Sequence, residues 1–335
     1  MRFRPVRTWL SWWVAAFLVC LGPGLHAVDT TRINGIDYVP LAEIGGSLGM
    51  DVQWLKSGER LRLKSEWTTM DFTVHRRDFT LNGTTLNLGW PIGTKGGQLY
   101  LSEVDYEKTL QPVLTPQVFD HVPKLYRIVI DPGHGGKDPG AQNRGLKVAE
   151  KTVVLDVAKR LKANLEKLGY KVSLTRDDDR YLELTDRSAV ANRARADLFI
   201  SLHFNATGSS SVSGLETYVF TAENMPSSSR GKLLGSDRRD YDGNENDTWN
   251  MLVGYYVQRE LVDQTHADDR GVKRARFTVL RDLQMPGILI EGGFVTSSSE
   301  GPKIGSASYR QKLADAIADG VVTYQRTLNR LRGRG

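Results

Sequence analysis

The sequence predicts an α/β fold in which a mixed sheet is flanked by helices on both faces and is preceded by a small α+β domain. Short β-branched runs, such as residues 126–130 and 198–202, end abruptly in turn residues, as buried strands do. Residues 150–167 repeat apolar side chains at helical spacing, which indicates a helix that packs on this sheet. Residues 28–115 instead contain short alternating segments joined by Asn-Gly turns.

The N-terminal region has the pattern of a small α+β unit. Two hairpins are predicted where Asn-Gly separates alternating segments, at residues 32–39 and 79–88. A short helix is expected at residues 41–50, and further strands at residues 51–54, 60–63 and 98–102. Prolines mark residues 116–124 as a linker. The predicted domains are therefore residues 28–115 and residues 125–332.

The second half of the chain alternates between strand and helix patterns. Strands are predicted at residues 171–175, 214–220, 277–280 and 287–290, and helices at residues 182–196, 249–263 and 309–331. Residues 221–248 are rich in Ser, Asp, Asn, Gly and Arg, and this composition predicts a long polar connection. Connections of this length are either functional lids or loosely ordered loops.

Residues 1–27 have the pattern of a secretory signal peptide. Three arginines precede an apolar stretch over residues 9–21, which is followed by Leu-His-Ala at residues 25–27. We expect cleavage after Ala27, export to the periplasm or cell envelope, and no stable membrane span after cleavage. An uncleaved anchor is the alternative, but the apolar stretch is short for a span. Cys20 is the only cysteine, so the mature chain would form no disulfide.

The charge of the chain gives little support for a polyanionic partner. The formal net charge of +6 falls by three, to +3, without residues 1–27, which carry three arginines and no acidic residue. No stripe of interleaved aromatic and basic residues is present in the sequence. We therefore expect no nucleic-acid partner.

Three candidate metal ligands follow these elements. His134 lies in a glycine-rich loop directly after the strand at residues 126–130, and His203 follows the strand at residues 198–202. Glu150 begins the intervening helix. Ligands bind at the carboxyl ends of strands in such sheets, and two imidazoles with one carboxylate and an open position form a catalytic zinc site. The alternatives are a solvated loop histidine, a satisfied core histidine and an acid that favours the helix dipole.

Three further residues are candidates for catalysis and substrate binding. Glu291 ends the apolar run at residues 287–290, so it is the natural acid/base beside a metal-bound water. Its alternative is a paired buried acid. Asn205 and Arg281 are candidates for orienting the substrate, although packing and surface pairing explain them equally well.

These motifs together resemble the zinc-dependent N-acetylmuramoyl-L-alanine amidases of the third amidase family. The matching segments run in order from about residue 125 to the C-terminus: DPGHGGKDPGA, GLKVAEK, LTR, ANRARADLFISLHFNA and VLRDLQMPGILIEGGF. The resemblance implies a zinc-amidase fold with one zinc ion held by His134, Glu150 and His203, and with Glu291 as acid/base. It also implies cleavage of peptidoglycan between the lactyl group of N-acetylmuramic acid and L-alanine.

The N-terminal region is similar to the small module at the N-terminus of copper amine oxidases, which also occurs in bacterial wall proteins. This likeness implies nothing about copper, and we expect a wall-binding or partner-binding accessory domain. In related amidases a segment of the chain can cover the zinc, so autoinhibition by residues 221–248 is a hypothesis. An activator protein or the division machinery is a further expected partner.

Two other functions remain alternatives at this point. A zinc peptidase could cut within the stem peptides or cross-bridges, because fold and metal do not by themselves set the substrate. A non-catalytic wall-binding scaffold would be expected to lack a ligand or the acid, and none of the four positions is lost.

Overall fold

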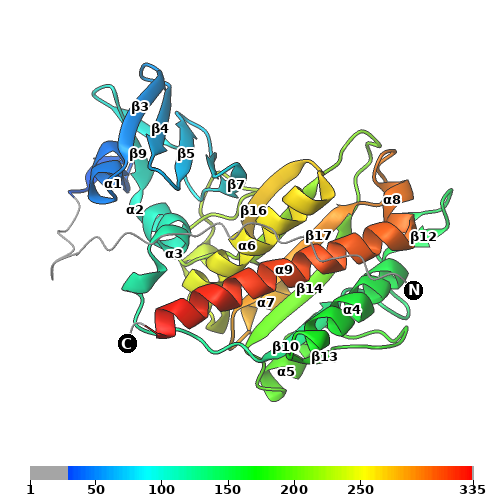
Figure 1. Cartoon of the computed structure of the whole chain (residues 1–335). Helices are drawn as coiled ribbons and strands as arrows, with labels where there is room; N and C mark the ends of the chain where they lie inside the picture. Colours follow the sequence, from blue (N-terminus) through cyan, green and yellow to red (C-terminus); the bar gives the residue numbers. More distant parts are fainter. Residues whose placement is uncertain (1–28, 334–335) are drawn as a thin grey trace, which may run out of the picture.

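The computed structural model describes residues 29–333, and the predicted signal peptide lies outside these residues. Its main feature is an 11-stranded sheet with strand order β13-β10-β14-β17-β15-β16-β7-β6-β5-β4-β3 (Figure 1). Strands β10, β14 and β17 are parallel to one another, whereas β15 is antiparallel to β17. The predicted mixed sheet is therefore confirmed.

The N-terminal region contributes the first nine strands. Its elements are β1 Thr31–Ile33, β2 Ile36–Pro40, α1 Leu41–Ser47, β3 Asp51–Lys56, β4 Arg60–Lys64, β5 Thr69–Thr73, β6 Asp78–Leu81, β7 Thr84–Asn87, β8 Gly93–Lys95, β9 Gln98–Ser102, α2 Glu103–Asp105, a π-helical turn Tyr106–Leu110 and α3 Gln111–Leu114. Both predicted Asn-Gly hairpins form, as β1–β2 and β6–β7. Strands β1, β2, β9 and β8 make a separate four-stranded sheet. The boundary at residues 116–124 stays a prediction.

The rest of the chain forms the larger part of the sheet and its helices. Its elements are β10 Arg127–Pro132, β11 Gln142–Asn143, β12 Val148–Ala149, α4 Glu150–Lys167, β13 Lys171–Leu174, α5 Leu184–Arg193, β14 Leu198–Asn205, β15 Leu215–Phe220, α6 Asp247–Thr265, β16 Asp269–Ala275, α7 Thr278–Arg281, β17 Gly287–Phe294, α8 Gly301–Gly305 and α9 Ala307–Arg332. Among the helices of residues 29–333, none combines the length and the apolar character that crossing a bilayer requires.

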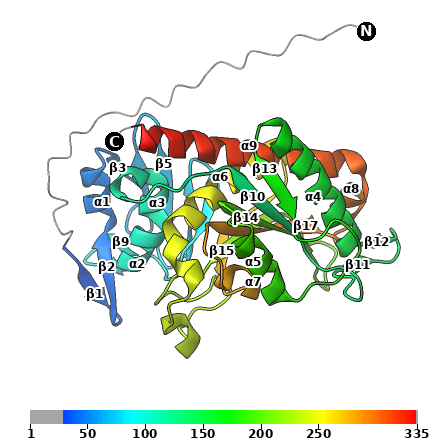
Figure 2. The ribbon, with the colours of Figure 1, turned by 90° about the horizontal axis from the view of Figure 1, so that it is seen from below.

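Apolar side chains of the central strands alternate between two cores, one on each face of the sheet. Ile128, Ile130 and Ile200 pack in the core that contains α4, α6 and α9. Val129 and Phe199 point the other way, into the smaller core that α5 and α7 cover. The two views agree that these groups of helices lie on opposite faces (Figure 2). Burial on both faces explains why these strands are apolar without alternation in the sequence.

In the second half, one predicted element is wrong and one strand was not predicted. Residues 277–280, expected as a strand, lead into the short helix α7, in which Val279 and Leu280 are buried against the α5 side of the sheet. A β-branched and aromatic run this short does not by itself distinguish a strand from a helical turn. Strand β16 was not predicted, because four of its seven residues are charged.

The polar connection 221–248 lies at the end of the sheet opposite to the strand ends that carry the two histidines. It follows Phe220 at the end of β15, and β15 runs antiparallel to β17, with Glu216 beside Glu291 and Tyr218 beside Leu289. The connection therefore leaves the sheet near Gly287, where β17 begins. This direction argues against residues 221–248 as a cover for the metal site.

Candidate metal centre

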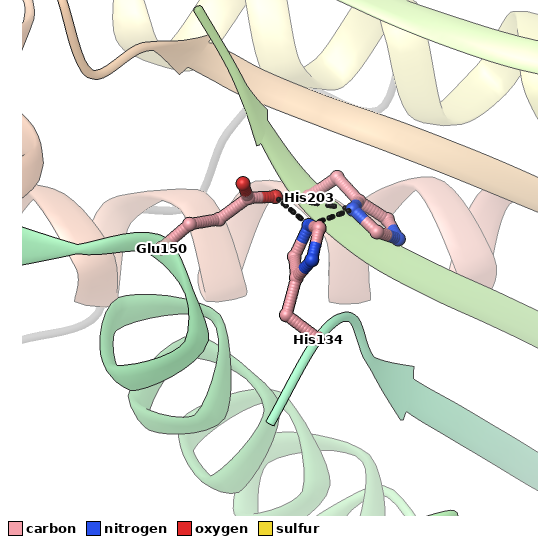
Figure 3. Close-up of side chains that lie close together, drawn as sticks. All are labelled: His134, Glu150 and His203. Carbon is pink, nitrogen blue, oxygen red and sulfur yellow. Dashed lines mark hydrogen bonds and ion pairs between the residues drawn. The ribbon is translucent and has the colours of Figure 1, made fainter. Parts of the chain in front are cut away.

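The three predicted ligands converge on one point, although they come from two strand ends and one helix start (Figure 3). His134 Nε2 lies 3.0 Å from Glu150 Oε1, and His203 Nδ1 lies 3.1 Å from the same oxygen. The two ring nitrogens are 3.2 Å apart. His134 follows β10, His203 lies near the end of β14 and Glu150 is the first residue of α4.

These three separations fit a tetrahedral metal ion. With metal–ligand bonds of about 2.0–2.1 Å at tetrahedral angles, ligand atoms lie about 3.3 Å apart, close to the observed 3.0, 3.1 and 3.2 Å. The side chain of Glu150 is 4% exposed, whereas those of His134 and His203 are 22% and 17% exposed. The centre is therefore closed beneath the carboxylate and open to solvent beside the imidazoles, as a catalytic site requires.

Glu150 is held by backbone amides as well as by the histidines. Its Oε2 accepts a hydrogen bond from the amide of Ala141 at 2.7 Å, and its Oε1 accepts one from the amide of Phe204 at 3.0 Å. Burial alone would raise the pKa of Glu150, but hydrogen bonds with His134 and His203 outweigh it and lower this pKa to about 2. The carboxylate is therefore ionised, and a metal ligand must be deprotonated.

Asp138 fixes the orientation of His134. The two side chains share a hydrogen bond of 2.7 Å between Nδ1 and Oδ2, so Nδ1–H donates to the carboxylate and Nε2 is left to face the centre. Burial opposes a positive charge on His134, yet Glu150 and Asp138 outweigh this effect and raise its pKa. The surroundings of this imidazole thus favour positive charge, as expected of a cation site.

Two buried arginines hold the loop that carries His134. Arg187 donates to the carbonyls of Pro132 and His134 and forms a 2.9 Å ion pair with the buried Asp131. Arg176, which is fully buried, donates to the carbonyls of Pro132 and Gly133. Fixed carbonyls keep a glycine-rich loop in one conformation, and His134 itself adopts a positive φ of 61°.

Glu291 lies beside the three candidate ligands but is not among the residues that converge. On the sheet it is directly paired with His203 on one side and with Glu216 on the other, so the three side chains share one face. Its Oε2 is buried without a hydrogen-bond partner. Burial, followed by repulsion from Glu150 and Glu216, raises the pKa of Glu291 well above 4.5, while Lys273 opposes the shift. A carboxyl whose proton affinity is raised in this way suits acid/base catalysis.

The two candidate substrate-binding residues have different surroundings. Asn205 ends β14 on the side of the metal centre, where its Nδ2 donates to Glu216 at 2.8 Å. Arg281 ends α7 at the opposite end of the sheet, ahead of the start of β17, and makes two 2.7 Å hydrogen bonds with Asp282. The position of Arg281 argues against contact with a substrate at the metal centre.

With this geometry in view, comparison with known proteins identifies the family. The sequence model of the family described as N-acetylmuramoyl-L-alanine amidase matches residues 128–323, which is more than half of the chain. The chain belongs to the N-acetylmuramoyl-L-alanine amidase family. The family resemblance and the enzyme class expected from the sequence are thereby confirmed. A second model, the copper amine oxidase N-terminal domain, matches residues 27–104 and confirms the resemblance of the N-terminal region.

Relatives of this amidase-family chain share its C-terminal part. It is 38% identical over 199 residues to N-acetylmuramoyl-L-alanine amidase LytC of Bacillus subtilis, covering 59% of this chain and 35% of that protein. It is 36% identical over 227 residues to amidase AmiC of Neisseria meningitidis, covering 62% and 54% respectively. The crystal structure of an amidase from Clostridium difficile 630 covers 60% of this chain and 97% of that one, at 34% identity and a TM-score of 0.51.

Sequence reasoning missed several residues that support the metal centre of this family member. Asp138 lies four residues after His134 inside the glycine-rich motif. A carboxylate so close in sequence to a candidate histidine ligand could have been recognised as its hydrogen-bond partner. Glu216 is the acid at an inward position of β15, where an unpaired carboxylate would be costly. Lys273 gave no such signal, because the strand that carries it was not predicted.

Replacing Asp138 with asparagine should weaken metal binding by about ten- to a hundredfold, because the carboxylate that aligns His134 and increases its basicity is lost. Competition with a chromogenic zinc chelator measures this affinity. Asp178→Asn, an exposed aspartate in the neighbouring loop, is the control and should bind zinc as the wild type does. Equal affinities for Asp138→Asn and the wild type would contradict the role of Asp138.

Replacing Gly133 with alanine should displace His203. A Cβ at this position would lie 2.2 Å from His203 Cε1 and 2.5 Å from its Nε2, which is closer than atoms in proteins approach. We therefore expect loss of bound zinc with the fold retained, measured by metal analysis and circular dichroism. Gly208→Ala serves as the control, since a Cβ there would contact nothing within 4 Å. Full zinc content in Gly133→Ala would show that His203 can move aside without leaving the metal.

Proposed function

We propose that this protein is a zinc-dependent amidase that cleaves peptidoglycan between the lactyl group of N-acetylmuramic acid and L-alanine of the stem peptide. The observation that carries the proposal is the convergence of His134, Glu150 and His203 within about 3 Å of one another, with Glu291 paired beside His203. Membership of the amidase family supports the substrate class, since peptidoglycan is the substrate of this family.

The residues of this chain divide the chemistry between them. The imidazoles of His134 and His203 and the carboxylate of Glu150 would hold the zinc ion. When bound, zinc polarises the scissile carbonyl as a Lewis acid and lowers the pKa of water at its open position. Glu291 accepts a proton from the attacking water and delivers it to the departing amine of L-alanine. Its raised pKa increases the affinity of the carboxylate for the proton that it takes from water.

The place of action follows from the substrate. Peptidoglycan lies in the bacterial cell envelope, so the protein acts after export, either in the periplasm or at the wall. The signal-peptide pattern of residues 1–27 supports this localisation. An activator protein or the division machinery remains an expected partner.

Digestion of purified sacculi tests the proposal. Mass spectrometry of the released material should show stem peptides that begin with L-alanine, and a chelator should abolish their release. Stem peptides or cross-bridges cut internally, with the lactyl amide intact, would favour a zinc peptidase and contradict the amidase. A preparation that binds sacculi and zinc but releases nothing would indicate a scaffold.

A further inference from the structure

The N-terminal domain is joined to the metal-binding half of the molecule through the large sheet itself. Strand β16 has β15 on one side and β7 of the N-terminal domain on the other, with Val272 paired with Leu86 (Figure 1). Both of these residues are fully buried. Without the N-terminal domain, β16 would be the edge of the sheet, and an edge strand leaves its backbone groups unpaired.

Several polar contacts fix β16 against β7. The side-chain amide of Asn87 donates to the carbonyls of Arg270 and Val272, at 3.4 and 3.1 Å. The backbone amide of Thr85 donates to the carboxylate of Asp269 at 2.6 Å. The strands approach so closely that a Cβ on Gly271 would lie 2.7 Å from the carbonyl oxygen of Thr85. Asn87 therefore holds the backbone on both sides of Gly271.

The far end of β16 is tied to the N-terminal domain as well. Arg274 is 1% exposed and donates to the carbonyl of Lys108, in the π-helical turn, and to that of Phe220, in β15. In the opposite direction, Arg77 of the N-terminal domain donates to the carbonyls of Ser227 and Ser228. A tethered module would not bury an arginine such as Arg274 across its boundary, so the two parts form one packed unit.

Strand β16, which contacts the N-terminal domain, carries two cationic side chains that lie near the candidate metal centre. Arg270 Nε lies 2.9 Å from Glu216 Oε2, and the ammonium group of Lys273 bonds to the same oxygen. Glu216 is 2% exposed and also receives the amide of Asn205. It is the direct neighbour of Glu291 on β17. The chain of contacts thus runs from Asn87 through β16 to the carboxylate beside Glu291.

We propose that the N-terminal domain is part of the catalytic apparatus, with Asn87 as a positioning residue that holds β16 where Arg270 and Lys273 reach Glu216 beside Glu291. The inference rests on the proposed function of Glu291. If β16 shifts, both cations move together, because they stand on one strand. Glu216 then lies beside Glu291 without its cationic partners, and the two neighbouring carboxylates repel each other.

The test uses the full chain, zinc-loaded, and a soluble N-acetylmuramoyl peptide that needs no wall binding. Asn87→Asp keeps the shape of the side chain but removes the donor and places a carboxylate against two carbonyls. We expect kcat to fall about tenfold, with KM, zinc content and binding to sacculi unchanged. Asn34→Asp makes the same chemical change in the exposed β1–β2 turn and should leave kcat as in the wild type.

A double-mutant cycle asks whether Asn87 acts through Lys273. Lys273→Gln should also lower kcat, and Lys273→Arg should retain most of it. Because Asn87→Asp also displaces Arg270, the double variant should be slower than Lys273→Gln alone, but by less than the full factor that Asn87→Asp costs in the wild type. Losses that multiply would overturn the link. If Asn87→Asp fails to fold, Asn87→Ala removes the donor without adding charge and is measured instead.

Two results separate this inference from the proposed function. Wild-type kcat in Asn87→Asp on the soluble peptide, together with weaker action on sacculi, would overturn the inference and make the N-terminal domain a wall-binding module. A parallel loss of zinc would also overturn it, since the effect would then be general damage to the site. Failure of the wild type to release peptides beginning with L-alanine would instead refute the proposed function.

Discussion

Replacing Glu291 with glutamine is expected to lower kcat by about a thousandfold while leaving zinc bound. The residue is paired beside His203 but is not among the three converging ligands, so its loss removes the proton carrier and not the metal. Glutamine keeps the size of the side chain, but its carboxamide cannot act as a proton acceptor or donor near neutral pH. Single-turnover hydrolysis of a soluble N-acetylmuramoyl peptide measures the effect, with metal analysis of the same preparation.

The control for this variant is Glu166→Gln, the same change at an exposed position of α4, which should retain wild-type kcat. Glu291→Gln with wild-type kcat would remove Glu291 from the mechanism. Loss of zinc in Glu291→Gln would show instead that this carboxylate takes part in holding the metal.

The same substitution should stabilise the metal-free protein in a pH-dependent way. The pKa of Glu291 is raised well above 4.5 on folding, so the folded state binds this proton more tightly than the unfolded state. Its stabilising contribution is complete below pH 4.5 and is lost as pH rises through the folded pKa. The free energy of unfolding of Glu291→Gln, measured by denaturant titration, should therefore exceed that of the wild type increasingly as pH rises. A constant difference across pH would contradict the shift.

Replacing Glu150 with glutamine should abolish both zinc binding and hydrolysis. The carboxylate accepts hydrogen bonds from two backbone amides, and a carboxamide would turn an NH₂ group toward one of them. The variant also lacks the negative charge that offsets the metal. We expect affinity to fall by more than about a hundredfold, beyond the effect of residues that only support a ligand. Isothermal titration of the metal-free protein with zinc measures this loss.

Chelation provides the matched comparison for Glu150→Gln. A chelator should lower the thermal midpoint of the wild type, because the metal binds only the folded state, but should leave that of Glu150→Gln unchanged. Added zinc should restore both the midpoint and the activity of the wild type alone. Activity that survives exhaustive chelation would contradict a metal-dependent reaction.

Local sequence patterns were sufficient to single out the three residues that converge at the candidate metal centre. Each of His134, Glu150 and His203 lies at a strand end or helix start that the apolar pattern marks, and strand ends of one parallel set meet at one edge of the sheet. The same logic located Glu291, and the order of the motifs indicated the family. Both faces of the central sheet are buried, so the signal for its strands was strong.

The sequence failed to predict structure where charged residues are buried. Strand β16 was missed because Arg270, Lys273 and Arg274 look like exposed residues until their partners are known. The direction of β15 likewise depends on pairing with β17, and only that direction places residues 221–248 away from the candidate metal centre. Such pairings join residues far apart in the chain, and local periodicity contains no information about them.

The sequence by itself therefore indicated the fold class and the family, and it singled out His134, Glu150, His203 and Glu291 as candidates, because a short local pattern marks each of them. Only the tertiary structure decided that the N-terminal domain continues the large sheet through β7 and β16. It also decided that Glu216 is surrounded by cations beside Glu291. The physical reason is that burial of charge is tolerated only when partners arrive from distant segments, and folding alone brings those segments together.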